Sequence, residues 1–270
     1  VQKMNFSIKH RGPDAGGIYI ENNLGLGHRR LSIIDTREVS NQPMHSNNKI
    51  WHLVFNGEIY NFEEIKSQLN YNFRTISDTE VILAAVEEKG LDWFINQANG
   101  MFAIALYNSE TKDLFLVRDR LGIKPLYFYN DGQYLIFSSE IKAILSSGLV
   151  QAKFNDDAVD EYLANRYVRE PNTFFENISQ VNSGTYLWVN KNLTIVENKY
   201  WDIPDAFNIA SEYNEEEILK GLDDELNKAI KYRLIADVPL GTYLSGGVDS
   251  SLITAITALN KKEKVNTYTI

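Results

Sequence analysis

Residues 102–137 read FAIALYNSETKDLFLVRDRLGIKPLYFYNDGQYLIF, and this stretch carries the clearest strand pattern in the chain. Runs of aromatic and β-branched residues alternate with groups of Asn, Asp, Gly and Ser, which favour turns. The stretch therefore predicts a meander of antiparallel strands joined by hairpin turns. Shorter runs at 18–20 and 51–55 extend this strand-rich region, and the dipeptide Asn56-Gly57 is expected to form the turn after 51–55.

Helices are expected between the strands. Residues 61–69 and 79–89 carry apolar side chains at spacings of three and four, and residues 77–80, SDTE, have the composition of a helix start. A third helix is expected at 156–165. Strands interrupted by helices predict an α+β domain of stacked sheets flanked by helices over residues 1–200.

The chain changes character near residue 200. Residues 201–214 are polar and irregular, as is typical of a linker. An amphipathic helix is expected at 215–234, followed by a strand at 240–244, a glycine-containing loop, a helix at 252–260 and a strand at 265–270. This order predicts that residues 215–270 begin a Rossmann-like parallel α/β domain.

The loop at 245–251, SGGVDSS, lies between the expected strand and helix. Its glycines allow a tight turn, and the start of the helix offers free N–H groups, so the loop suits phosphate or pyrophosphate. No Gly-Lys-Ser/Thr follows the glycines, which excludes a Walker A loop and favours chemistry at the α-phosphate of ATP. Asp249 could help to place Mg²⁺. The alternative is a plain Ser/Gly turn before a capped helix.

Composition excludes several classes of protein. The 27 basic and 36 acidic residues give a net charge of -9, a poor match to binding nucleic acid through its phosphate backbone. The chain has no cysteine, so disulfides, thiolate zinc sites and a thiol nucleophile within these residues are excluded. The longest apolar run, 101–107, is too short for a membrane helix. A cytoplasmic protein with no membrane partner is expected.

The first 143 residues contain a series of short motifs: HRGPD at 10–14, GHRRLSIID at 27–35, FNGEIYN at 55–61, SDTE at 77–80, DRLGIKPLY at 119–127 and SEIKA at 139–143. This series resembles the glutaminase domain of class II glutamine amidotransferases. The loop at 245–251 resembles the PP-loop of ATP pyrophosphatases. Together, in this order, they are similar to the glutamine-hydrolysing asparagine synthetase family.

The resemblance implies a four-layer αββα sandwich of the N-terminal nucleophile (Ntn) hydrolase type, followed by the start of a PP-loop domain. In the family the nucleophile is an N-terminal cysteine whose free α-amine acts as the general base. Because this chain has no cysteine, we expect a fragment truncated at both ends that lacks the first strand and glutaminase activity. A natural chain that has lost its nucleophile is the alternative.

The resemblance also assigns a glutamine site. Arg30 matches the arginine that holds the α-carboxylate, and Asp78 matches the partner of the α-ammonium group. Asn56 and Gly57 match the oxyanion hole. The remaining matched positions are Leu31, Ser32, Ile33, Ile34 and Glu58. Taken singly, Arg30 could form a surface ion pair, Asn56-Gly57 a hairpin turn, and Asp78 a helix N-cap.

Two further groups of residues are assigned. His10 and His28 are expected to make structural hydrogen bonds, since this type of nucleophile needs no histidine base. The ATP site implied by the resemblance, with Asp249 as the candidate Mg²⁺ ligand, comprises Leu244, Ser245, Gly246, Gly247, Asp249, Ser250, Ser251 and Ile270.

The implied reaction joins both sites. Ammonia from glutamine would displace AMP from β-aspartyl-AMP, giving asparagine, glutamate, AMP and pyrophosphate. Glutamine, aspartate and ATP are thus the expected small-molecule partners, and a homodimer is possible. Two alternatives stay open: an amidotransferase acting on another carboxylate acceptor, such as a surface-polysaccharide sugar or a lactam precursor, and a sensing relic without a nucleophile.

Overall fold

The computed structural model describes residues 1–204 and 214–269. The chain divides into two compact units, Val1–Asp202 and Ile203–Ile270. The boundary lies close to the end of the strand-rich region expected from the sequence. The linker expected at 201–214 lies mostly outside the described residues. Each unit is described here by itself.

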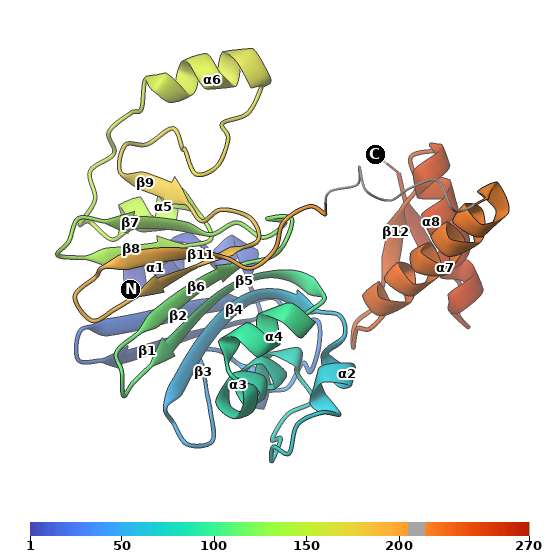
Figure 1. Ribbon diagram of the computed structural model, residues 1–270, viewed down its shortest axis with the longest axis horizontal. Coiled ribbons are helices and arrows are strands. Elements are labelled where there is room, and N and C mark those ends of the chain that lie inside the picture. Colours follow the sequence, from blue (N-terminus) through green and yellow to red (C-terminus); the bar gives the residue numbers. More distant parts are fainter. Residues whose placement is uncertain (205–213, 270) are drawn as a thin grey trace. The chain divides into compact units, whose positions relative to one another are not determined.

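A six-stranded antiparallel sheet forms one central layer of the first unit (Figure 1). The central strands β4 and β5 pair along their whole length, from Trp51 opposite Asn108 to Ile59 opposite Gly100. In spatial order the strands are β11 (Ile195–Lys199), β10 (Thr185–Val189), β6 (Leu114–Arg118), β5 (Gly100–Asn108), β4 (Trp51–Ile59) and β3 (Met44–His45).

A second layer of strands packs on the inner face of this sheet. It consists of the hairpin β1 (Ala15–Glu21) and β2 (Leu24–Arg30) and of a separate sheet in the order β8 (Leu135–Ser138), β7 (Tyr127–Asn130) and β9 (Ile178–Gln180). The buried side chains between the layers form a continuous apolar core, which includes Leu26, Val54, Leu116, Leu126 and Leu187.

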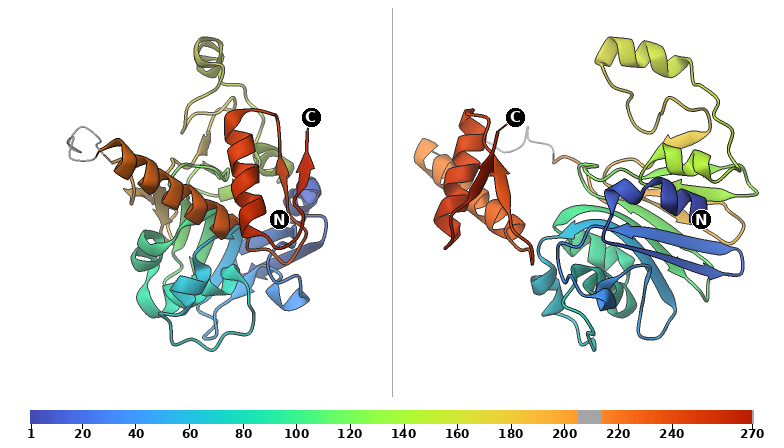
Figure 2. Two further views of the ribbon diagram at one scale, coloured as in Figure 1. Left: turned by 90° about the vertical axis from the view of Figure 1, so that its right-hand side faces the viewer. Right: turned by 180° about the vertical axis from the view of Figure 1, so that it is seen from behind.

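Helices cover both outer faces. The six-stranded sheet is covered by α2 (Phe62–Lys66), α3 (Asp78–Lys89) and α4 (Leu91–Gln97), and the second layer by α1 (Gln2–Ser7) and α5 (Ile141–Ser146) (Figure 2). Short 3₁₀ turns lie at Lys9–Arg11 and Glu38–Ser40, and α6 (Asp157–Asn165) projects from the layers. The order helix, sheet, sheet, helix confirms the four-layer αββα sandwich.

The expected meander at 102–137 is wrong in its pairing. β5 and β6 pair as expected, but β6 pairs on its other side with β10 instead of β7. After Arg118 the chain crosses to the second layer, where β7 and β8 form their own hairpin. The strands themselves are where the sequence predicts them, since strand pattern is local and pairing is not.

The expected turn at Asn56-Gly57 is also wrong, because both residues lie inside β4. A Cβ atom on Gly57, whose φ is +155°, would lie 2.0 Å from the carbonyl oxygen of Met101 on β5. Glycine is therefore required here by the close approach of a neighbouring strand, and not by a turn.

The second unit has the expected strand–loop–helix–strand order. Its elements are α7 (Glu215–Arg233), β12 (Gly241–Tyr243), α8 (Val248–Asn260) and β13 (Asn266–Tyr268). β12 and β13 pair in parallel, which confirms the beginning of a parallel α/β domain. The helix expected at 252–260 begins earlier, at Val248, so the second half of the SGGVDSS loop forms the first helical turn. Within residues 1–204 and 214–269, no helix has both the length and the apolar character needed to span a membrane.

Candidate functional site

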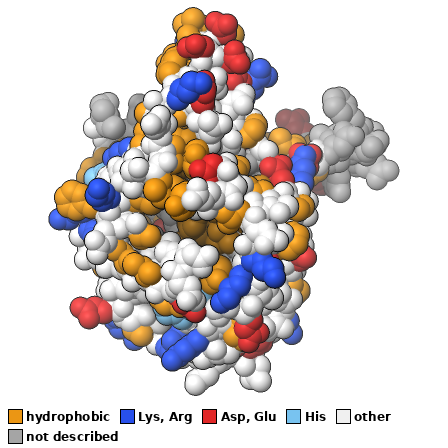
Figure 3. Space-filling view, turned by 90° about the vertical axis from the view of Figure 1, so that its left-hand side faces the viewer, with side chains coloured by type: hydrophobic (Ala, Val, Ile, Leu, Met, Phe, Trp, Pro, Cys, Tyr) orange, Lys and Arg blue, Asp and Glu red, His pale blue; other side chains and the backbone are white. Residues whose placement is uncertain are grey.

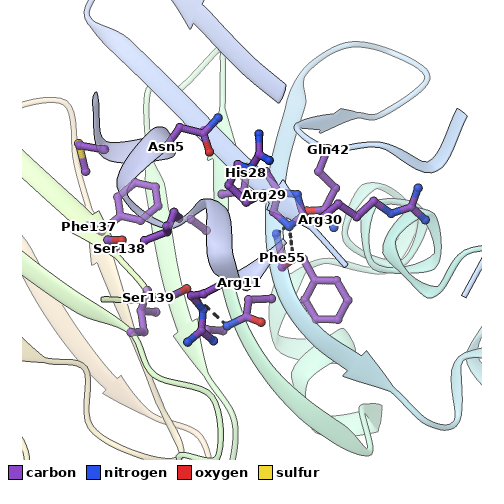
Figure 4. Close-up of a pocket in the computed structure, with 18 of the residues that line it drawn as sticks. Asn5, Arg11, His28, Arg29, Arg30, Gln42, Phe55, Phe137, Ser138 and Ser139 are labelled. Carbon is purple, nitrogen blue, oxygen red and sulfur yellow. Dashed lines mark hydrogen bonds between the residues drawn. The ribbon is translucent and has the colours of Figure 1, made fainter. Parts of the chain in front are cut away.

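A cavity of about 640 Å³ opens between β2 and β8 in the first unit. Val54, Phe55 and Ala105 of the six-stranded sheet contribute to its lining, as do Met4 and Asn5 of α1. Figure 3 shows a hollow in one face of the molecule with hydrophobic side chains inside it, and Figure 4 shows polar side chains projecting from several elements around the cavity. The cavity is thus apolar at its base with polar groups placed around it.

The glutamine-binding residues assigned from the sequence converge on this cavity, although they come from separate segments of the chain. Ser32 is the exception, because it is not among the lining residues and its N–H group donates to Asp14 Oδ2 at 2.8 Å. The assigned residues that line the cavity are Arg30, Leu31, Ile33, Ile34, Asn56, Gly57, Glu58 and Asp78.

Arg30 is buried and shapes one wall of the cavity. Its Nη1 donates to the Arg37 carbonyl and to Asn41 Oδ1, both at 3.0 Å, and its Nη2 donates to the carbonyls of Ile34 and Asp35 at 3.1 and 2.5 Å. The side chain does not form a surface ion pair, so that alternative is wrong. Arg30 holds the loop that follows β2, and its binding of a carboxylate stays a prediction.

Asp35 also stabilises this loop. Its buried carboxylate accepts hydrogen bonds from Arg37 Nε at 2.6 Å and Nη2 at 2.7 Å, and from the N–H of Ile76 at 3.0 Å. The hydrogen bonds from Arg37 hold the pKa of Asp35 well below its usual range. Through Ile76, this ion pair ties the wall of the cavity to the segment that starts α3.

Asp78 begins α3 and is buried beside the cavity. Its Oδ2 accepts the N–H of Ile59 at 3.0 Å, and its Oδ1 accepts the hydroxyl of Ser77 at 3.3 Å. Burial raises the pKa of Asp78 to about 6. The N-cap alternative is wrong, because Ser77 is the N-cap and its hydroxyl accepts the N–H of Thr79. A buried carboxylate of this kind favours a cationic partner.

Asn56 and Gly57 lie side by side on β4 at the cavity. Asn56 Nδ2 donates to Oγ of Ser139, which also lines the cavity, at 3.4 Å, a long hydrogen bond that a ligand could replace. Gly57 exposes its backbone without a side chain in the way. An amide side chain beside a glycine N–H is an arrangement that can stabilise a developing oxyanion.

Two polar residues that sequence reasoning did not assign to the site also line the cavity. His28 Nε2 lies 3.0 Å from the carbonyl oxygen of Phe55, which fits its expected role in structural hydrogen bonding. Gln42 Oε1 accepts the N–H of the same Phe55 at 2.6 Å. The sequence carries no signal for Gln42, because its partner is distant in the chain. His10, also expected to be structural, bonds to Glu140 outside the cavity at 2.8 Å.

In the second unit the SGGVDSS loop joins β12 to α8. Gly246 has φ +84°, a conformation that favours glycine. Ser245 Oγ lies 3.1 Å from Ser250 Oγ, and the N–H of Leu244 donates to the Tyr268 carbonyl at 2.8 Å. The assigned ATP residues from Leu244 to Ser251 therefore gather at the N-terminus of a 13-residue helix. Ile270 lies outside the described residues.

The fit of the loop to Mg²⁺ rests on one carboxylate. Among residues 1–204 and 214–269 there is no cluster of three or more metal-ligating side chains. Asp249 is the acidic residue in the first turn of α8. Mg²⁺ commonly uses one or two carboxylates together with substrate phosphates, so a single aspartate fits such an ion only when nucleotide is present.

Comparison with known proteins gives matches in both units. A model of the glutamine amidotransferase domain matches residues 1–201, and a model of asparagine synthase matches residues 221–270. A glutamine-hydrolysing asparagine synthetase 2 of Bacillus subtilis is 36% identical over 98% of this chain and 36% of its own length. The amidase chry2 of Gibberella zeae is 38% identical over 92% of this chain and 37% of its own length.

A relative from Methanocaldococcus jannaschii, also named for glutamine-hydrolysing asparagine synthetase, is 36% identical over the whole chain, which covers 56% of that protein. The chain thus spans about half or less of the length of these relatives. Among solved structures, a glutamine phosphoribosylpyrophosphate amidotransferase of Bacillus subtilis is similar with a TM-score of 0.49 at 18% identity, covering 91% of this chain and 51% of that one. Because the domain model matches residues 1–201, this chain belongs to the glutamine amidotransferase domain family.

Proposed function

We propose that this chain supplies the glutamine-binding part and the start of the ATP-binding part of a glutamine-hydrolysing asparagine synthetase, an ATP-dependent carbon–nitrogen ligase. The observation that carries the proposal is the convergence of Arg30, Asn56, Gly57 and Asp78 on one cavity. These residues were assigned from motifs far apart in the sequence, and the fold brings them together. Relatives with this name match the chain across both units.

Each group in the cavity suits one part of glutamine. The buried carboxylate of Asp78 suits the α-ammonium group. The Nη atoms of Arg30 already hold the loop after β2, so its positive charge, and not a bidentate contact, would attract the α-carboxylate. The side-chain amide of Asn56 and the N–H of Gly57 suit the oxygen of the carboxamide, where negative charge develops when the amide is attacked.

None of residues 1–270 is cysteine, so the proposed reaction needs a thiol that these residues do not supply. A thiol reacting at the carboxamide carbon would form a thioester and release ammonia, and water would then release glutamate. Residues 1–270 by themselves are therefore expected to bind glutamine without turning it over. Detectable glutamate release from the pure chain would contradict this.

The loop at 245–251 supports the ATP half of the proposal. Its backbone N–H groups and serine hydroxyls at the start of α8 suit the pyrophosphate of ATP, and Asp249 would hold Mg²⁺ bound to the phosphates. Activation of aspartate at its β-carboxylate would follow. The Mg²⁺ ion, a homodimer and a cytoplasmic location stay predictions of the sequence analysis.

A different acceptor is the second candidate. The amidase chry2 is as similar to this chain as the asparagine synthetases are. Both readings share the glutamine and ATP sites, so the acceptor separates them. The longer protein, assayed with glutamine and ATP, should form asparagine from aspartate under the first reading and should ignore aspartate under the second.

The glutamine site itself is tested on the chain by calorimetric titration with glutamine. Asp78→Asn keeps the shape of the side chain and an acceptor for the N–H of Ile59 but removes the charge. We expect it to weaken glutamine binding by at least about tenfold, as expected for loss of a buried charge-assisted contact. Asp160→Asn on the exposed face of α6 serves as the matched control and should bind as the unaltered chain does. If the unaltered chain bound no glutamine, the proposal would fail.

A further inference from the structure

The edge of β4 that faces β3 and the cavity makes backbone hydrogen bonds at one end and hydrogen bonds to side chains further along. Near its start, backbone groups of the β3 segment cover it, with Met44 opposite Leu53 and the N–H of Ser46 donating to the Trp51 carbonyl at 3.0 Å. β3 begins at Met44, opposite Leu53, so no residue of β3 lies opposite the part of β4 after Leu53. Further along β4, side chains make the hydrogen bonds to the backbone groups of this edge.

At Phe55, two side chains hold the backbone. Gln42 Oε1 accepts its N–H at 2.6 Å, and the ring of His28 bonds to its carbonyl at 3.0 Å. At Ile59, Asp78 Oδ2 accepts the N–H at 3.0 Å. Gln42 and Asp78 are buried, so these hydrogen bonds are shielded from water.

The register places Gly57 midway between these anchors. In an antiparallel strand the N–H and C=O groups of alternate residues face opposite edges. Trp51, Phe55 and Ile59 use the edge away from β5, so the alternation directs the N–H of Gly57 to that same edge. The anchored positions on each side fix where this N–H lies at the cavity.

The protonation of His28 follows from its surroundings. A carbonyl oxygen can only accept, so Nε2 carries the hydrogen. Nδ1 is buried and has no hydrogen-bond partner among the described residues. Burial lowers the pKa of His28 to about 4, so the ring is neutral near pH 7, with Nδ1 unprotonated. Figure 4 shows the dashed bond that joins the ring to Phe55.

We propose that His28 and Gln42 are positioning residues. Their hydrogen bonds to the backbone of Phe55 align the side chain of Asn56 and the N–H of Gly57 toward a glutamine carboxamide. This inference rests on the proposed glutamine site. Neither residue contacts the carboxamide in this scheme, since both act through β4. Their loss would leave the strand in place through its ladder with β5 but would let the edge at Phe55 move.

The test uses four variants of the chain. His28→Ala and Gln42→Leu each remove one hydrogen bond to the backbone of Phe55. His28→Gln places an amide donor near the position of Nε2 and should restore the hydrogen bond to the Phe55 carbonyl. Thr173→Val is the matched control, because it removes another buried hydrogen bond, from Thr173 Oγ1 to the Ile178 carbonyl at 2.7 Å, which lies outside β4.

Two readouts are taken on each variant. The amide signals of Asn56 and Gly57 are recorded by NMR without ligand, and glutamine affinity is measured by titration. His28→Ala and Gln42→Leu should shift both amide signals and weaken glutamine binding by about tenfold, while His28→Gln should stay within about threefold of the unaltered chain. Thr173→Val should change neither readout.

The outcomes separate the two proposals. If the unaltered chain bound no glutamine, the proposed function would fail, and the ligand-free signals of Gly57 would still decide the role of His28 and Gln42. Unchanged Asn56 and Gly57 signals in folded His28→Ala and Gln42→Leu would overturn the inference. If those variants did not fold, the ¹⁵N NMR spectrum of the His28 imidazole in the unaltered chain decides. A proton on Nε2 supports the hydrogen bond to the Phe55 carbonyl, and a proton on Nδ1 refutes it.

Discussion

Replacing Gly57 by Ala should destabilise the first unit strongly. The new Cβ would lie 2.0 Å from the Met101 carbonyl oxygen and 2.7 Å from the Cα atom of Phe102, and both atoms belong to the backbone of the paired strand β5. Neither atom can move without separating β4 from β5 at the centre of the sheet. Overpacking of this kind costs about 1–3 kcal/mol, and an unfavourable φ adds about 1–3 kcal/mol.

We therefore expect a loss of about 2–6 kcal/mol in the free energy of unfolding, from these two contributions together. Gly132→Ala is the matched control. Gly132 has φ +83°, and a Cβ there would meet no atom within 4 Å. It should lose only the backbone contribution, about 1–2 kcal/mol. The difference between the two variants isolates the steric contact with β5.

Urea unfolding followed by tryptophan fluorescence suits this comparison. The chain has two units, so a signal from one of them is needed for a simple transition. Every tryptophan of the chain belongs to the first unit, at Trp51, Trp93, Trp188 and Trp201. A Gly57→Ala variant that lost no more stability than Gly132→Ala would refute the close contact between β4 and β5.

Three further predictions concern charge and the nucleotide loop. Glutamine affinity should fall as the pH drops below about 6. Burial raises the pKa of Asp78 to about 6, and protonation removes the charge that would pair with the ammonium group. Titrations with glutamine between pH 5 and 8 should show this loss of affinity, and Asp78→Asn should abolish its pH dependence. Asp35 has a lowered pKa, so its ion pair with Arg37 stabilises the fold above the ordinary aspartate pKa of about 3.9, and this contribution is lost as the pH falls through the lowered folded-state pKa; Asp35→Asn should remove that acid dependence from urea midpoints. Gly246→Ala should weaken binding of a fluorescent ATP analogue by about tenfold because φ is +84°, whereas Gly221→Ala inside α7, with open space around it, should not; equal affinities would count against the loop as the phosphate site.

Local patterns located most of the elements. The strand Leu114–Arg118 lies in the stretch 102–137 where strands are expected, and the helix expected at 79–89 runs from Asp78 to Lys89, next to its N-cap Ser77. The amphipathic helix Glu215–Arg233 is preceded by its N-cap Asn214, which forms a capping box with Glu217. Such signals act within a few residues, so one sequence is enough to find them.

The candidate site was assigned through motifs, and the fold added what the motifs do not contain. The resemblance of the motifs to a known family points to Arg30, Asn56 and Asp78, and these residues line one cavity. Gln42 and the partner of His28 were not predicted, because each contacts Phe55 across a gap in the sequence. No pattern of residue types near Gln42 indicates which backbone group its amide will meet.

The sequence by itself determined which segments become strands and helices, and where the glycine-rich loop precedes a helix. Only the tertiary structure decided that Asn56-Gly57 lies within a strand, since a turn dipeptide is overridden when a neighbouring backbone pairs with it along its whole length. It also decided that β6 pairs with β10 and that the edge of β4 is closed by side chains. The physical reason is the same in each case: local propensity is set by adjacent residues, whereas pairing and burial depend on which distant segments the packed layers bring into contact.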